Sequence, residues 1–381
     1  MRGRENNQSQ LFFTIDVESR IRCDHPLRAI KTRVDGILST MDELFSSAYS
    51  KFGRPSVPPE RLLKALLLMA LYSVRSERQL AERIDTDLLF RWFLDMDPEE
   101  AAFDATVLSH NRPRMEEHGI ISAFFDGVLR DAVAGGLCSD DHFTVDGTMI
   151  ESMASMKSFR PRDESNDDSQ DSNGFKPRNP DVDFKGEKRS NETHQSRTDP
   201  EAKLYRKGPG KPSQLSHFGH ILTENRNGLI VEAMVTEANG KAECDAALAM
   251  ADRFTAKHGK TPTTLGADKG YDNGPILIEL EQRKIEPHIA MTKKTPADPE
   301  TSAKKRRPGI KARLRMKKRQ ATIEYSISQR VRKKVEECFG WLKTIAGLDR
   351  SRHAQRWKLK QQFELGCAAY NLVRLKKLLP T

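Results

Sequence analysis

The chain has 381 residues, about two to three times the length of an average domain, so we expect two domains or one large domain with insertions. Hydrophobic residues make up 37% of the sequence and charged residues 31%, a balance typical of soluble proteins that argues against a membrane or fibrous protein. The 64 lysines and arginines outnumber the 54 acidic residues and give a formal net charge of +10, which favours polyanionic partners, nucleic acid first.

The five cysteines form no CxxC pair and have no metal-ligand spacing, so we expect neither a disulfide framework nor a zinc site. The first residues are polar and charged, and no apolar segment follows them. The longest uninterrupted apolar run, Ala65–Tyr72, is far shorter than the ~18 residues of a membrane span. The sequence therefore predicts a cytoplasmic protein that is neither secreted nor membrane-embedded.

Residues 1–135 are predicted to be helical. Pro58 and Pro59 precede a segment in which leucines recur at helical spacing, and Ser76 is placed to cap the helix ERQLAERI that follows. We assign this part to an N-terminal helical domain for DNA binding or dimerisation. A packing domain without nucleic-acid contact fits the pattern equally well.

Residues 138–375 are predicted to form a second domain with a mixed α/β sheet. The segment HFTVDGTMI has the β-branched and aromatic composition of a strand, and residues 217–237 form two strands joined by a turn at Asn225–Gly228. A helix over 243–259, a strand ending near 268, a helix, a short strand and a closing helix follow. This order predicts a mixed sheet covered by helices.

Two segments interrupt this pattern. Residues 157–203 contain four large apolar residues among many polar ones, too few to repay the entropy of ordering, so we expect a flexible polar insertion. Residues 304–319 form a basic segment with ten lysines and arginines and no acid, which repels itself unless an anion lies against it. We expect this segment to contact DNA phosphates without sequence preference. The cations that open it are Lys304, Lys305, Arg306 and Arg307.

Two aspartates lie where predicted strands end. Asp146 is near the end of its strand, on the opposite side from Phe143 and Val145. Asp268 follows the strand TTLGA, and Gly270 lets the chain turn sharply beside it. Cleavage of a phosphodiester bond by two metal ions needs about three carboxylates around cations about 4 Å apart, so both aspartates are candidates. Taken singly, each is equally typical of a turn or a helix cap.

The third candidate acid lies in a predicted helix over residues 330–348. At about 100° per residue, Arg332, Glu336 and Lys343 fall within about 40° of one another, beside the apolar face. Glu337 points away from that face and is expected in solvent. We therefore predict Glu336 as the catalytic acid, with Arg332 and Lys343 positioning DNA phosphates. Taken alone, Arg332 and Glu336 are equally typical of a surface pair.

These residues together resemble a known family. VDGT at Asp146 and ADKGYD at Asp268 are similar to the first two motifs of bacterial insertion-sequence transposases of the DDE type, and Arg332, Glu336 and Lys343 keep the spacing of the third. The resemblance extends over roughly residues 20 to 375, in the expected order. It points to the large group that includes the fourth- and fifth-named insertion-sequence families.

The resemblance implies an RNase H-like catalytic core in which Asp146, Asp268 and Glu336 bind two Mg²⁺ or Mn²⁺ ions, with no need for ATP. It also implies binding to double-stranded DNA at terminal inverted repeats and target sites, a homodimer, and a nucleoid-associated bacterial enzyme. The sequence departs from the family where a tyrosine is expected: Gln329 occupies that position, and Tyr325 lies one turn earlier.

Two other functions remain open at this stage. One is a metal-dependent nuclease on the same fold that does not transfer strands. The other is a non-catalytic DNA-binding protein derived from a transposase. The N-terminal helical part and the basic segment argue against the first, and the presence of all three acids argues against the second.

Overall fold

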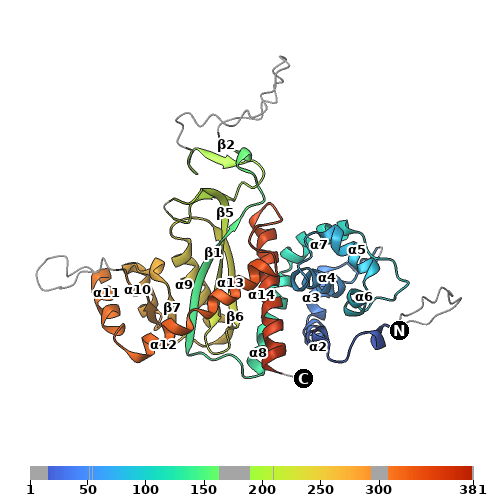
Figure 1. Cartoon of the computed structure of the whole chain (residues 1–381), viewed down its shortest axis with the longest axis horizontal. Helices are drawn as coiled ribbons and strands as arrows, with labels where there is room; N and C mark the ends of the chain where they lie inside the picture. The colour runs from blue at the N-terminus through green and yellow to red at the C-terminus, as the bar shows by residue number, and fades with distance from the viewer. Residues whose placement is uncertain are drawn as a thin grey trace, which may run out of the picture.

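The computed structural model describes residues 16–50, 52–53, 55–162, 189–208, 210–292 and 308–379. Figure 1 shows a sheet with its helices on one side of the long helix α14 (Arg356–Leu378) and the N-terminal helices on the other side. No helix in these ranges is long and apolar enough to cross a membrane.

The N-terminal part is helical, as predicted. Pro59 is the first residue of α4, where its missing N–H is no loss, and the Ser76 Oγ accepts a 3.1 Å hydrogen bond from the Gln79 N–H as the cap of α5. The helices are α1 (Val17–Arg20), α2 (Pro26–Ser39), α3 (Asp42–Ala48), α4 (Pro59–Leu71), α5 (Glu77–Thr86), α6 (Leu88–Phe93), α7 (Ala105–Glu117) and α8 (Ile120–Ala134).

The second part is built on a mixed sheet in which β6, β5, β1, β7 and β8 lie side by side in that order. The first three strands are antiparallel, and β7 and β8 run parallel to β1. This strand order and direction are those of an RNase H-like sheet, which confirms the predicted fold class. The strands are β1 (His142–Glu151), β4 (Lys203–Tyr205), β5 (Gln214–Glu224), β6 (Ile230–Glu237), β7 (Thr264–Ala267) and β8 (Glu286–Ile289), with β4 on the same edge of β5 as β6.

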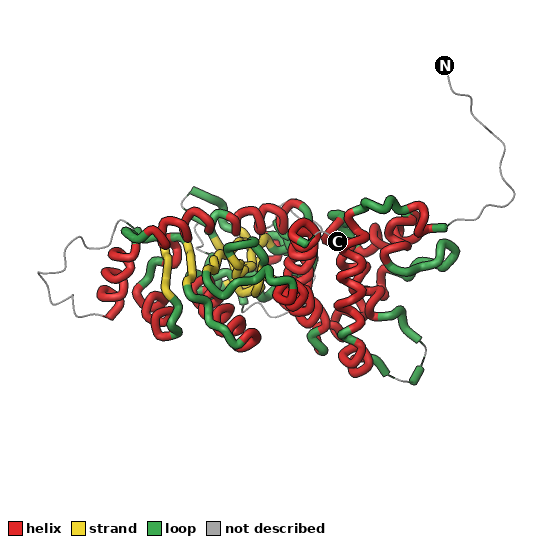
Figure 2. Tube along the Cα trace, turned by 90° about the horizontal axis from the view of Figure 1, so that it is seen from below, coloured by secondary structure: helices red, strands yellow, loops and turns green. Residues whose placement is uncertain are grey.

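Helices cover both faces of this sheet, and Figure 2 shows the strands between them. Phe143 and Val145 of β1 pack into a core with α9 (Ala242–His258), whereas Ile150 packs with the opposite layer. The alternation follows from the two-residue period of a strand. The remaining helices of this part are α10 (Gly274–Gln282), α11 (Pro308–Arg319), α12 (Ile323–Val331) and α13 (Lys334–Thr344).

A single hydrophobic core joins the N-terminal helices to the sheet. It contains buried residues of α2, α4 and α8 together with Ile221 of β5, Ile230 of β6 and the apolar face of α14. Helix α14 contacts α8, α4 and α2 on one side and β6 on the other. The N-terminal helices therefore share a core with one face of the sheet, whereas the opposite face has its own core with α9 and α10.

The predicted flexibility of residues 157–203 is wrong for the two ends of that segment, while 163–188 lie outside the described residues. Strand β2 (Phe159–Pro161) pairs with β3 (His194–Ser196), and the buried Phe159 and Ala202 form a small core. The low apolar content of the whole segment misled the prediction, because Phe159 and Ala202 near its two ends are enough to form a small core together with Ala154 and Leu215.

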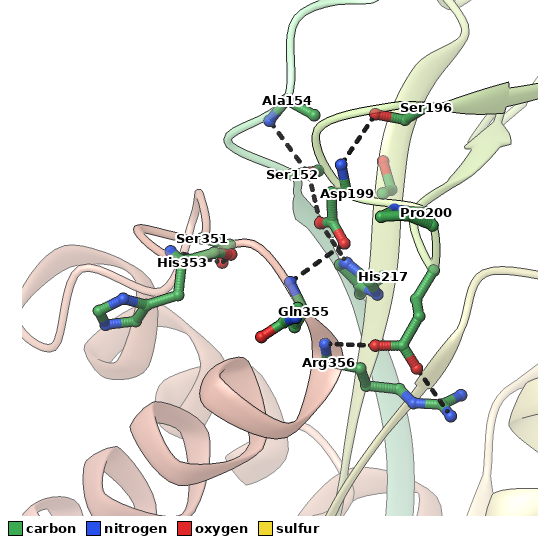
Figure 3. A network of polar contacts seen from close by, with 12 residues as sticks. Ser152, Ala154, Ser196, Asp199, Pro200, His217, Ser351, His353, Gln355 and Arg356 are labelled. Carbon is green, nitrogen blue, oxygen red and sulfur yellow. Dashed lines mark hydrogen bonds and ion pairs between the residues drawn. The ribbon is translucent and has the colours of Figure 1, made fainter. Parts of the chain in front are cut away.

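Asp199 fixes the second end of this segment, as Figure 3 shows. Its carboxylate is fully buried and accepts hydrogen bonds from the Ser152 Oγ (2.7 Å), the His217 Nε2 (2.9 Å) and the Gln355 N–H (3.2 Å). Three elements distant in sequence, β1, β5 and the start of α14, thus meet at one acid. Although burial opposes the charge, these partners lower the pKa of Asp199.

The predicted continuous helix over 330–348 is also wrong. The chain forms two helices, α12 and α13, which are separated at Arg332 and Lys333. At this break the backbone hydrogen bonds have the tighter spacing of a 3₁₀ turn, with the Val335 N–H donating to the Arg332 carbonyl at 3.1 Å. The two helices pack on different parts of the sheet, α12 on β7 and β8 and α13 on β1. Periodicity alone shows only that both have an apolar face, so the break was not visible in the sequence.

Candidate active site

Asp146 lies where β1 separates from β7. The strand does not end there as predicted, because β5 continues to pair with β1 as far as Glu151. On the other edge, however, pairing with β7 stops at Thr144, which lies opposite Gly266. Asp146 is therefore two residues beyond the last pair of this parallel ladder.

Asp268 occupies the corresponding position on β7. It follows the last residue of the strand and lies two residues beyond Gly266, so the register places it level with Asp146 on adjacent parallel strands. The Asp268 Oδ1 accepts a 2.7 Å hydrogen bond from the Gly270 N–H and caps a short turn of 3₁₀ helix over Lys269–Tyr271. The predicted neighbourhood of the two aspartates follows directly from this parallel pairing.

Glu336 is an exposed residue in the first turn of α13, the helix that packs on β1. Its charge acts on Asp146. The pKa of Asp146 is raised to about 6, chiefly by burial and in part by the negative charges of Asp268 and Glu336, while the Gly147 N–H and Arg332 act to lower it. Three acids far apart in sequence thus share one electrostatic environment.

The three carboxylates are suitable ligands for divalent cations, but they are not arranged around a common cation position. No ion pair involves Asp146, Asp268 or Glu336 in the part of the chain that the structure describes, so their charges are not neutralised by a side chain at contact distance. Carboxylate oxygens are the ligands that Mg²⁺ and Mn²⁺ prefer. Within the same residues, no group of three Asp, Glu, His or Cys side chains is close enough to hold a metal ion, so binding requires side-chain movement.

Two transposase families match the sequence: "Transposase domain (DUF772)" over residues 15–114 and "Transposase DDE domain" over residues 193–372. The chain belongs to the DDE transposases. The second match includes Asp268 and Glu336, and Asp146 precedes it. Assignment of this transposase to the group of the fourth- and fifth-named insertion-sequence families stays a prediction.

Solved structures of other transposases are distantly similar. The piggyBac transposase, in a synaptic complex with hairpin DNA, is 11% identical, with 91% of this chain and 73% of that chain covered and a TM-score of 0.37. The Mos1 transposase in a pre-cleavage transpososome is 10% identical, with 85% and 81% covered and a TM-score of 0.21. Comparison of the transposase with curated proteins gave no match.

Arg332 of the transposase lies at the C-terminal end of α12 and is oriented by Gln329. The Arg332 Nε donates a 3.3 Å hydrogen bond to the Gln329 Oε1, and the Gln329 side-chain amide donates to the backbone carbonyl of His288 in β8. Tyr325, one turn earlier, directs its hydroxyl to the Ile289 carbonyl at 3.5 Å. Gln329 thus ties α12 to the sheet from the position where the family has a tyrosine.

Lys343 lies beside an acidic side chain of the protein, whereas its predicted partner was a DNA phosphate. Its Nζ lies 3.5 Å from the Asp349 Oδ1, an exposed acid in the loop after α13. Glu336 and Lys343 both lie on α13, whereas Arg332 ends α12, so the three residues do not share one continuous helix. The role of Lys343 in positioning phosphate stays a prediction.

The basic segment is partly neutralised inside the transposase. Arg313 of α11 pairs with the buried Asp272 at 2.7 Å, and Arg315 and Arg319 pair with Glu281 of α10. Acids up to 41 residues away in sequence thus supply part of the counter-charge that this segment needs, and its contact with DNA phosphates stays a prediction. The predicted phosphate contacts Lys304, Lys305, Arg306 and Arg307 lie outside the described residues.

Sequence reasoning missed a fourth acid of this region, Glu243 in the first turn of α9. Its pKa is raised to about 7, chiefly by burial and in part by the negative charges of Asp268 and Asp146. The only trace of Glu243 in the sequence is its place at the start of the helix after the third main strand. Helical periodicity could not place its side chain near two aspartates on other strands.

Proposed function

We propose that Asp146, Asp268 and Glu336 of this transposase bind two divalent cations, Mg²⁺ or Mn²⁺, and that this site cleaves and joins DNA strands at the ends of an insertion sequence. The observation that carries the proposal is the shared electrostatic environment of the three acids. Asp268 and Glu336 both raise the pKa of Asp146, and no cationic side chain pairs with any of the three among the described residues. Such a cluster of negative charge gains stability when cations bind.

The residues around the acids support a phosphoryl-transfer role. Bound divalent cations activate a water or a DNA 3′-hydroxyl for attack and stabilise the leaving oxygen, so cleavage and joining differ in the nucleophile alone. Arg332, held by Gln329, contributes a guanidinium whose planar donors match a phosphate of the DNA backbone. Asp146 and Asp268, on adjacent strands, provide the rigid part of the site.

We further propose that double-stranded DNA, at both terminal inverted repeats and target sites, lies against the N-terminal helices. A cavity of about 360 Å³ there is lined by Arg75, Arg78 and Arg352. Burial lowers the pKa of Arg352, and the nearby positive charge of Arg75 lowers it further, which shows how closely these cations are grouped. Because two transposon ends must be held together for joining, we propose that the active form is a homodimer.

The test of the catalytic site compares two adjacent acids on α13. We expect Glu336→Gln and Asp268→Asn to reduce Mg²⁺-dependent nicking of a plasmid carrying the inverted repeats by about a hundredfold or more, or about 2.7 kcal/mol of transition-state stabilisation. Glu337→Gln is the control, because Glu337 is exposed and its nearest cation is Arg374 at 3.8 Å. Gel-shift measurements check that each variant still binds DNA. Equal nicking by Glu336→Gln and Glu337→Gln would remove Glu336 from the mechanism.

A second assay separates transposition from simple hydrolysis. Excised ends with free 3′-hydroxyls are incubated with target plasmid and Mg²⁺, and joined products are detected by gel electrophoresis. We expect the unsubstituted protein to join the ends. Cleavage without joining would support a nuclease, and DNA binding with neither activity would support a non-catalytic protein.

A further inference from the structure

Two glycines of the aspartate motifs lie against Glu243. A Cβ atom on Gly147 would be 3.2 Å from the Glu243 Oε1, and one on Gly270 would be 3.7 Å from the Glu243 Oε2. Neither glycine is among the residues with positive φ, so backbone conformation does not explain why both positions lack a side chain. The two glycines instead leave the space that the Glu243 carboxylate occupies, beside Asp146 on one side and Asp268 on the other.

Asp268 and Glu243 approach the same point from different elements. The position of a Cβ on Gly270 is 2.9 Å from the Asp268 Oδ1 as well as 3.7 Å from the Glu243 Oε2. In a two-cation site the cations are about 4 Å apart, and each binds carboxylate oxygens at about 2.1 Å. Oxygens up to about 8 Å apart can therefore both be ligands of the site. The separation of these two acids is therefore within the reach of a two-cation site.

A buried hydroxyl without a partner provides an independent observation. Tyr271, which follows Gly270, has 1% of its surface exposed, and its hydroxyl has no hydrogen-bond partner. Among charged groups, Glu243 acts most strongly on this hydroxyl, followed by Asp146 and Asp268. A buried hydroxyl that lacks an acceptor costs about 1–3 kcal/mol, so the Tyr271 hydroxyl is available to donate to a group that enters this acidic region.

His220 provides a second buried atom without a hydrogen-bond partner. Its Nε2 lies 2.8 Å from the Thr236 Oγ1, whereas its buried Nδ1 has no partner. That Nδ1 would be 2.9 Å from a Cβ on Gly147, the same point that lies 3.2 Å from the Glu243 Oε1. A buried nitrogen without a partner thus lies close to the Glu243 carboxylate.

We propose that Glu243 is a fourth carboxylate of the divalent-cation site, close enough to Asp268 to bind the same pair of cations. This inference rests on the proposed function, because it requires cations at Asp146 and Asp268. The Tyr271 hydroxyl orients the Glu243 carboxylate, and the missing side chains of Gly147 and Gly270 give it access. The site then draws acids from both helical layers, Glu243 from α9 and Glu336 from α13.

A structural role for Glu243 makes different predictions. An acid in the first turn of a helix interacts favourably with the helix dipole, and Asp245 lies in the same first turn of α9. Asp245 is exposed, and no ion pair involves it in the described part of the chain. Asp245→Asn is therefore a matched control that removes one negative charge from the same helix end.

The experiment measures Mn²⁺ binding by the full chain without DNA, from the electron paramagnetic resonance signal of free Mn²⁺. We expect Glu243→Gln to bind Mn²⁺ at least about tenfold more weakly than the unsubstituted protein, and Asp245→Asn to bind it unchanged. Glu243→Asp keeps the charge but shortens the side chain, and it should also weaken binding. Circular dichroism verifies that each variant is folded.

Variants of the aspartates separate this inference from the proposed function. If Asp146→Asn and Asp268→Asn weaken Mn²⁺ binding but both Glu243 variants bind like the unsubstituted protein, the role of Glu243 is overturned and the three-acid site stands. If the aspartate variants bind normally, or if the unsubstituted protein binds no Mn²⁺, the proposed cation site itself is overturned, and the role of Glu243 with it.

Discussion

Glu364 shows how a single buried acid makes stability depend on pH. It lies on α14 with 7% of its surface exposed, and its Oε2 accepts a 2.7 Å hydrogen bond from the Ser122 Oγ of α8. Burial raises its pKa above the ordinary value of 4.5, and although Lys360 and Ser122 oppose this, Glu116 and Asp126 add to it. The acid is thus held at the contact between α8 and the helix that joins the two halves.

We predict that Glu364→Gln stabilises the protein at pH 8 more than at pH 5. Because the folded state has the higher pKa, it binds more protons than the unfolded chain, so the free energy of unfolding falls as pH rises from about 4.5 through the folded-state pKa. Glutamine keeps an acceptor for Ser122 and removes the charge. Urea unfolding at both pH values measures the difference, with Glu99→Gln, an exposed acid, as the control. A stability gain that is equal at both pH values would contradict this account.

At the same scale, the sequence could predict some site residues and not others. The positions of Asp146 and Asp268 were predictable because each lies at or just after a segment of strand-forming residues, and parallel strands bring these positions together. Glu336 was distinguished from Glu337 by helical angle alone. Glu243 was not predictable, since its position depends on how α9 lies over β1 and on two glycines distant in sequence.

Between elements, the approach of α14 to β5 depends on Gly219. A Cβ atom at this position would be 2.5 Å from the Cε2 of Phe363 and 2.9 Å from the Cδ1 of Ile150, and both of these side chains are buried. Because Phe363 belongs to α14 and Ile150 to β1, three elements meet at one missing side chain. The packing of α14 on the sheet is therefore close-fitting at this point.

We predict that Gly219→Ala destabilises the protein by about 1–3 kcal/mol, because the added methyl group overpacks this contact. Gly240→Ala is the control, since no atom lies within 4 Å of a Cβ at that position. Equilibrium unfolding in urea measures both variants. The expected result is a lower midpoint for Gly219→Ala alone, and equal midpoints would show that Phe363 can move aside at little cost.

The elements that sequence analysis misjudged share a cause. Arg315 and Arg319 of α11 pair with Glu281 of α10, which lies 34 residues before Arg315, and no local pattern reveals such a pair. The break between α12 and α13 likewise arises because the two helices pack on different strands. By contrast, the hairpin at Asn225–Gly228 and the cap at Ser76 are local, and both predictions are confirmed.

On the scale of the whole molecule, α14 determines how the two halves behave together. Composition and periodicity indicated a helical domain followed by an α/β domain, and both patterns are present in the structure. Yet one continuous core contains residues of α2, α4 and α8 together with β5, β6 and α14. Polar contacts add to it, such as the Gln361 side-chain amide of α14, which donates to the Arg112 carbonyl of α7 at 2.9 Å.

A shared core predicts that the protein unfolds in one cooperative step. Removing α14 from either half would expose buried apolar surface on both, so neither half keeps its stability when the other unfolds. We expect scanning calorimetry to show a single transition with equal calorimetric and van't Hoff enthalpies. Ile121→Val changes a buried residue of α8 and should reduce the free energy of unfolding by about 0.5–1.5 kcal/mol. The midpoint of the single transition should therefore fall. Two transitions, of which Ile121→Val moves only one, would show instead that the N-terminal helices fold as a separate unit.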